Sequence, residues 1–176
     1  MPFEQKATSS ERRFEPKVST GLRNPTRTTS GSVSEELHLR LSRKDFQRLA
    51  ELRAREAGAL ARSRNQQGAY YLAGYAVECA LKACIAKKTK RHEFPPDRAF
   101  TNKIYTHDLR VLMKEAGLQG ELEKDMQANQ ALAVNWNTVQ IWTEESRYVT
   151  NGLNGKDLHL AVVGAHGVLP WITKHW

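Results

Sequence analysis

Two oppositely charged residues interrupt an otherwise apolar stretch of the chain at residues 68–86. Glu78 and Lys82 stand four positions apart, so on a helix they share one face, with the acidic residue first, which is the favourable order. Removing a charge from water without giving it a partner is costly. We therefore expect each of them to be paired, either at the rim of the protein or in a buried ionic network that fixes the register of neighbouring helices.

A second set of residues could act on phosphate groups. His107 is followed by Asp108, and Arg147 and Tyr148 lie far along the chain. A histidine can take a proton from a ribose 2′-hydroxyl, and an arginine can neutralise the charge that develops on a phosphate. For this chemistry His107 and Arg147 would have to converge, and Asp108 or Glu78 would orient the histidine. The simpler interpretation is a histidine that forms a local hydrogen bond beside a helix cap.

The segment 68–86 predicts a buried helix at the centre of the fold. Apolar residues occur there at almost every helical offset, and such a helix is normally buried on most of its faces. It is too short, and too interrupted by charge, for a membrane span. Before it, residues 43–64 carry apolar residues at three- and four-residue spacing, so we expect an amphipathic helix. Ser42 and Asp45 are spaced for a capping box at its start.

The rest of the chain also shows helical patterns. Thr106 is expected to cap a helix that has Asp108 in its first turn and ends at Gly117. Apolar residues at helical spacing continue through residues 118–149 and 156–176, where Pro170 is expected to kink the chain or to begin a new turn. No segment shows a convincing strand pattern. The sequence therefore predicts an all-α fold, an up-and-down bundle of four to five helices over residues 35–176.

Residues 1–34 differ in composition from the rest of the chain. They are rich in Ser, Thr, Arg, Pro and Gly, and six basic residues against three acidic ones give a net charge of +3. Such a segment buries too little apolar surface to order itself, so we expect a disordered basic tail. It could hold RNA or DNA non-specifically, although a solvated leader is the simpler interpretation. The net charge of the whole chain, +8, is equally compatible with an anionic partner and with none.

The two cysteines offer no metal site. Cys79 and Cys84 stand five positions apart in the central helix, so they point in different directions and match no zinc spacing. We expect buried reduced thiols and no cofactor. The N-terminus lacks the apolar core of a secretory signal, and no segment reaches transmembrane length. A cytoplasmic location without membrane attachment is therefore expected.

Three blocks of the sequence together resemble the HEPN domain family. They are Tyr75-Ala76-Val77-Glu78-Cys79-Ala80-Leu81-Lys82-Ala83, Thr106-His107-Asp108-Leu109, and Trp142 with Arg147-Tyr148. The resemblance extends from about Arg43 to the C-terminus and leaves out the basic tail. It implies an up-and-down helical bundle that often forms homodimers. It also implies either metal-independent RNA cleavage, common in toxin–antitoxin and defence systems, or a non-catalytic domain that pairs with a nucleotidyltransferase or binds nucleotide or RNA.

The nuclease motif of this family is absent from the chain. That motif places a histidine four to six residues after an arginine, and none of the six histidines here has this spacing. The preferred hypothesis is therefore a non-catalytic HEPN-like domain, homodimeric, that binds nucleotide, RNA or a nucleotidyltransferase-type partner protein. Its binding site or polar core would contain Glu78, Lys82, Asp108, Arg147 and Tyr148.

Two alternatives stay open. The first is a metal-independent ribonuclease, a toxin or defence effector, with a rearranged site made by Arg147 and His107. The second is a dimeric structural or antitoxin-like interaction protein anchored by Trp171, Ile172 and Trp176, since tryptophan is favoured at interface hot spots. A C-terminus docked on the chain's own body would explain the same three residues.

Overall fold

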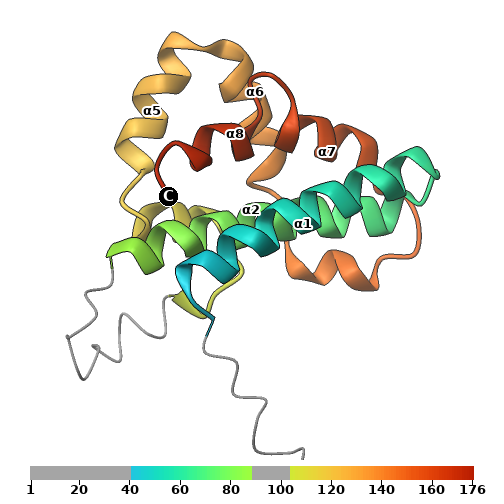
Figure 1. The fold of residues 1–176 in the computed structure, drawn as a ribbon. Coiled ribbons are helices and arrows are strands. Elements are labelled where there is room, and N and C mark those ends of the chain that lie inside the picture. Colours follow the sequence, from blue (N-terminus) through green and yellow to red (C-terminus); the bar gives the residue numbers. More distant parts are fainter. Residues whose placement is uncertain (1–40, 89–103) are drawn as a thin grey trace, which may run out of the picture. The chain divides into compact units, whose positions relative to one another are not determined.

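The computed structural model describes residues 41–88 and 104–176, all of which belong to one unit, Leu39–Trp176 (Figure 1). The predicted basic tail at residues 1–34, and the predicted start of the domain at residues 35–40, lie outside the described residues. Within the two described ranges the regular structure is helical and contains no strand. The all-α prediction is confirmed for this part of the chain.

The first two helices form a hairpin. Helix α1 spans Arg43–Arg62 and α2 spans Gln66–Lys88, and the two lie side by side in Figure 1. The predicted capping box is confirmed, because the Ser42 hydroxyl accepts a hydrogen bond from the backbone N–H of Asp45, whose carboxylate accepts one from the backbone N–H of Ser42. The short link between the helices contains Arg64 with a φ of 63°.

Helix α2 is the central helix, as predicted. It contacts α1, the later helices α4, α7 and α8, and the 3-10 helix η1. Its buried residues include both apolar side chains and the charged Glu78, and they extend from Ala69 to Ile85. A helix that is surrounded in this way positions the elements that pack on it.

The rest of the described chain forms shorter helices than the sequence predicts. They are α4 (Leu109–Glu115), α5 (Gln119–Ala128), α6 (Gln130–Val139), η1 (Glu144–Tyr148), α7 (Gly155–Val163) and α8 (Val168–Thr173). The predicted number of four to five helices is therefore too low. The helical region expected at residues 118–149 is divided at Asn129, which ends α5 and also caps α6 by accepting a hydrogen bond from the backbone N–H of Leu132.

The last predicted helix breaks at glycines rather than at Pro170. A Cβ atom on Gly164 would lie 2.7 Å from the carbonyl oxygen of Leu160, and one on Gly167 would lie 2.5 Å from that of Val162. Only glycine allows the backbone to approach so closely. Pro170 stands in the first turn of α8, where its missing N–H leaves no intrahelical hydrogen bond unmade.

The C-terminal aromatic cluster packs on the chain itself. Trp171 and Ile172 are buried in the core, and the indole N–H of Trp171 donates to the carboxylate of Asp125 at 2.8 Å. Trp176 is partly buried and packs against the same core. The hypothesis that Trp171 and Ile172 anchor a partner is therefore wrong, because their surface is already used within the chain.

The cysteines behave as predicted. Cys79 and Cys84 are both free and buried. Burial raises the pKa of Cys79 to about 12, with a further contribution from the neighbouring charge of Glu78, and burial raises the pKa of Cys84 to about 11. In the described part of the chain, no helix is long and apolar enough to cross a membrane.

Candidate functional site

A buried carboxylate connects two of the residues singled out in the sequence. The Glu78 side chain is 2 % exposed, and its Oε1 accepts a hydrogen bond from Lys82 Nζ at 2.8 Å. Its Oε2 lies 2.9 Å from Nδ1 of His107, which comes from the segment before α4. The predicted pairing of Glu78 with Lys82 is confirmed, and of the two carboxylates considered for orienting His107, Glu78 is the one in contact.

This contact fixes the orientation of the histidine ring. The oxygens of an ionised carboxylate only accept hydrogen bonds, so this contact favours the tautomer of His107 that carries its proton on Nδ1. The other ring nitrogen, Nε2, has no hydrogen bond to any described residue, and the side chain is 40 % exposed. A histidine held by a carboxylate through one nitrogen, with the other free, can accept or deliver a proton at that second nitrogen.

The helix cap beside His107 lies two residues later than predicted. Asp108, not Thr106, is the N-cap of α4, because its carboxylate accepts hydrogen bonds from the backbone N–H groups of Arg110 and Val111 at 2.8 and 3.3 Å. The Thr106 hydroxyl accepts from the backbone N–H of Asp108 at 3.1 Å and supports the cap. Burial pushes the pKa of Asp108 upward, but the hydrogen bonds from Arg110 and Val111 outweigh it and lower that pKa.

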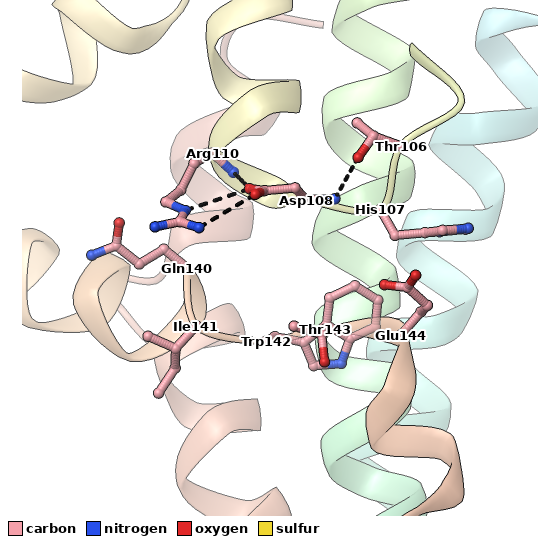
Figure 2. Close-up of a pocket in the computed structure, with 9 residues that line it drawn as sticks. All are labelled: Thr106, His107, Asp108, Arg110, Gln140, Ile141, Trp142, Thr143 and Glu144. Carbon is pink, nitrogen blue, oxygen red and sulfur yellow. Dashed lines mark hydrogen bonds and ion pairs between the residues drawn. The ribbon is translucent and has the colours of Figure 1, made fainter. Parts of the chain in front are cut away.

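His107 and Asp108 line a pocket of about 390 Å³, within the usual order of volume for small-molecule sites (Figure 2). The other lining residues come from the segment before α4, from α4, from the segment that joins α6 to η1, and from the start of η1: Thr106, Arg110, Gln140, Ile141, Trp142, Thr143 and Glu144. In Figure 2, Arg110 and Gln140 lie on one side, and His107 and Glu144 on the other. The pocket therefore combines a guanidinium, an imidazole and two carboxylates.

The guanidinium of Arg110 is loosely held. It lies 3.3 to 3.5 Å from the carboxylate oxygens of Asp108, and its side chain is 68 % exposed. An exposed pair of this kind contributes little to stability, with a median of about 0–1 kcal/mol. Arg110 can therefore exchange its partner for an anionic ligand at small cost.

Trp142 holds one wall of the pocket against α2. Its side chain is 1 % exposed and sits where Gly74 has no side chain: a Cβ atom on Gly74 would lie 2.2 to 2.3 Å from the indole ring. The absence of a side chain at Gly74 therefore sets how closely the segment after α6 approaches α2. The indole N–H of Trp142 is buried and has no partner among the described residues.

Arg147 and Tyr148 do not line this pocket. They belong to η1, and both are exposed. The Arg147 guanidinium lies 4.8 Å from the centre of the Tyr148 ring. Interaction with Tyr148, and in smaller part with Tyr71, raises the pKa of Arg147. The site predicted from sequence is thus divided: Glu78, Lys82, His107 and Asp108 are linked by direct contacts or by the chain, and Arg147 and Tyr148 belong to a different surface.

Three pocket residues were not predicted from the sequence: Arg110, Gln140 and Glu144. Each is a polar residue near the end or on the exposed side of a short helix, a position where polar residues are ordinary. Only the spacing of Arg110 two positions after the capping aspartate offered a local signal, because a first-turn side chain can reach back to the cap. Gln140 and Glu144 carry no such signal, since they reach the pocket only through the packing of Trp142 on Gly74.

Comparison with family models yields no match for this chain, and comparisons with curated proteins and with solved structures yield none either.

Proposed function

We propose that this chain is a HEPN-like helical domain that binds the phosphate of a nucleotide or of RNA in the pocket lined by His107 and Arg110. The observation that carries the proposal is the contact of His107 with the buried carboxylate of Glu78, which holds the imidazole in place on a pocket that is also lined by the exposed guanidinium of Arg110. Arginine is well suited to phosphate because its planar fork can donate two parallel hydrogen bonds.

Because the pocket also contains carboxylates, we expect its affinity for phosphate to be moderate. Asp108 already occupies the fork of Arg110, and Glu144 adds a second negative charge to the lining. A phosphate would have to replace Asp108 as the partner of Arg110. Such a site favours a ligand that also makes contacts beyond its phosphate.

The experiment is a binding measurement on the full chain with 5′-AMP as the probe, by calorimetry at low ionic strength. A mononucleotide is preferable to RNA because a chain of net charge +8 attracts any polyanion. Arg110→Gln is expected to weaken binding about tenfold, the equivalent of one charged hydrogen bond of about 1.5 kcal/mol. Arg55→Gln, which removes the same charge from the exposed side of α1, is the matched control and is expected to leave binding unchanged.

His107→Asn is the second variant, and it is expected to weaken 5′-AMP binding by a similar factor. Urea unfolding of each variant separates a binding defect from a folding defect. Equal affinity of Arg110→Gln, Arg55→Gln and the unmodified chain would contradict the proposal.

A second candidate function is metal-independent RNA cleavage, and the pairing of His107 with Glu78 favours it. In this reaction the imidazole Nε2 would take the proton of a ribose 2′-hydroxyl, and the 2′-oxygen would form a bond to phosphorus. The bond from phosphorus to the 5′-oxygen would break, and that oxygen would take a proton from solvent water, while the imidazolium returns its proton to solvent. Arg110, rather than Arg147, would balance the charge on the phosphate, because Arg110 shares the pocket with His107.

Cleavage is tested with a single-stranded RNA in the presence of EDTA. The candidate predicts products ending in a 2′,3′-cyclic phosphate, loss of cleavage in His107→Ala, and no cleavage of an RNA that lacks the 2′-hydroxyl at the cut position. Cleavage that survives in His107→Ala, or that also occurs without the 2′-hydroxyl, would refute this candidate.

The resemblance to HEPN domains also leads us to propose a homodimer and a nucleotidyltransferase-type partner. Light scattering on the protein as it elutes from a size-exclusion column tests the homodimer. The expected mass is twice the 20.0 kDa of one chain. A mass of one chain at micromolar concentration would contradict the homodimer.

A further inference from the structure

A second pocket adjoins the one described above. It has a volume of about 290 Å³, and it shares two lining residues, Arg110 and Gln140, with the pocket that contains His107. Its other lining residues are Met113, Gln119, Leu122, Glu123, Met126, Trp136 and Asn137. Arg110 and Gln140 therefore border both cavities, so a ligand in either one can reach the side chain of Arg110.

Part of the second pocket is lined by apolar residues. Met113, Leu122 and Trp136 are almost fully buried and contribute apolar and aromatic surface, and Met126 is half-buried beside them. A thioether and an indole are favourable neighbours for a flat aromatic ring. The first pocket contains the imidazole of His107 and two carboxylates, and the second contains one carboxylate, that of Glu123.

Amide side chains line the second pocket beside its apolar residues. Gln140 Nε2 donates to Asn137 Oδ1 at 2.8 Å, which fixes both amides. This bond leaves Gln140 Oε1 as an acceptor and Asn137 Nδ2 as a donor. An acceptor and a donor presented together match the polar edge of a nucleobase, which asparagine and glutamine commonly recognise.

We infer that the pocket lined by Met113 and Trp136 is a nucleobase subsite, and that Arg110 at the shared edge holds the phosphate of the same nucleotide. The inference extends the proposed function, on which it rests for the phosphate contact, and it identifies the ligand class as a nucleoside monophosphate or an unpaired nucleotide of RNA. The base lies against the apolar residues, and its edge bonds to the amides of Asn137 and Gln140. Arg110 borders the second pocket, so a phosphate contact and an apolar surface for the base are available to one ligand.

The test compares three probes on the full chain: 5′-AMP, ribose 5-phosphate, which has no base, and adenosine, which has no phosphate. 5′-AMP is expected to bind at least tenfold more tightly than ribose 5-phosphate. The double variant Asn137→Ala/Gln140→Ala is expected to weaken 5′-AMP and adenosine about fivefold to tenfold and to leave ribose 5-phosphate unchanged. Arg110→Gln is expected to weaken 5′-AMP and ribose 5-phosphate and to leave adenosine unchanged.

The matched control is Gln127→Ala, which removes an exposed amide from α5 outside both pockets. Both altered amides lie at the end of α6 rather than in the core, so these variants are expected to fold, and urea unfolding checks this.

The outcomes separate the two claims. Equal binding of 5′-AMP and ribose 5-phosphate, with no effect of the double variant, overturns the base subsite and leaves the phosphate site standing. Adenosine binding that depends on Asn137 and Gln140, without any effect of Arg110→Gln on 5′-AMP, supports the base subsite and overturns the phosphate site. Failure of all three probes to bind at millimolar concentration overturns both.

Discussion

His107 and Arg147 both lie beside α2, but they are held in different ways. His107 contacts a carboxylate that is 2 % exposed, and that carboxylate is itself bonded to Lys82. Arg147 is exposed and rests on the ring of its chain neighbour Tyr148 at 4.8 Å, with a further interaction with Tyr71 on α2. The first residue is positioned by the core of the fold, and the second by its immediate neighbours on the surface.

The difference indicates that His107, rather than Arg147, is oriented for a role in ligand binding or catalysis. A side chain that acts on a ligand works best when its orientation is fixed before the ligand arrives. Glu78 provides this for His107, and the guanidinium that shares the pocket is Arg110. Four predictions, ordered by the size of the expected effect, test this contrast.

The largest effect is expected at Trp142, which lines the pocket that contains His107 and comes just before the 3-10 helix that contains Arg147. A Cβ atom on Gly74 would lie 2.2 Å from the ring of Trp142. Gly74→Ala is expected to lower the free energy of unfolding by about 2–3 kcal/mol, because the overpacking exceeds the gain in helix propensity of about 1 kcal/mol. Urea unfolding measures the change.

Gly120→Ala is the matched control for this substitution. Gly120 lies in α5, and a Cβ atom there meets nothing within 4 Å. Gly120→Ala is therefore expected to leave the free energy of unfolding unchanged or to raise it by up to about 1 kcal/mol. A similar loss of stability in both variants would mean that close packing on Trp142 is not the cause.

The next effect separates the two regions directly. Glu78→Gln removes the charge that holds both Lys82 and His107, and we expect it to lower the free energy of unfolding by about 2 kcal/mol, the scale of hydrogen bonds to charged groups. Arg147→Gln is expected to change it by less than about 0.5 kcal/mol, as for ordinary surface substitutions. Equal effects in urea unfolding would contradict the contrast between a core-held and a surface-held residue.

A smaller effect concerns the cap beside His107. The pKa of Asp108 is lowered in the folded chain, so its carboxylate contributes stability above its unfolded pKa of about 3.9, and this contribution is lost as the pH falls through the folded pKa. Asp108→Asn keeps a capping side chain but removes the charge. The unmodified chain should therefore be more stable than the variant at pH 6, and the difference should shrink toward pH 2. A difference that stays constant with pH would show that the charge is not responsible.

The smallest effect concerns the two cysteines, which we expect not to react with an alkylating reagent in the folded chain. Burial raises the pKa of Cys79 to about 12 and that of Cys84 to about 11, so roughly one Cys84 thiol in a thousand is ionised at pH 8. Iodoacetamide should modify neither cysteine in the folded chain and both in urea, as mass spectrometry would show. Rapid modification of Cys79 in the folded chain would mean that the face of α2 around Glu78 is open to solvent.

Much of the helical core could be predicted from the sequence, because the evidence for it is local. Apolar residues at every helical offset identified α2, and the four-residue spacing of Glu78 and Lys82 identified their contact. The capping box at Ser42 was visible for the same reason. The break at Asn129 also had a local signal, a residue that commonly caps helices, but the apolar spacing on both sides of it concealed the break.

The pocket could be predicted only in part. His107 and Asp108 were found because they are adjacent to each other in a recognisable block, whereas Gln140 and Glu144 depend on how Trp142 packs against Gly74. Such packing between distant segments leaves no periodic pattern in the sequence. Arg147 was chosen as the partner of His107 because it belongs to a motif, and the structure instead brings Arg110 into the pocket.

Whether Glu78 fixes His107 for ligand binding through the second ring nitrogen is tested by the nitrogen NMR spectrum of the histidine side chains. His107→Asn assigns the resonances. We expect that neutral His107 carries its proton on Nδ1, that Glu78→Gln abolishes this preference, and that 5′-AMP shifts the Nε2 resonance. A proton on Nε2 in the unmodified chain, together with no response of either nitrogen to saturating 5′-AMP, would show that Glu78 does not prepare His107 for ligand binding.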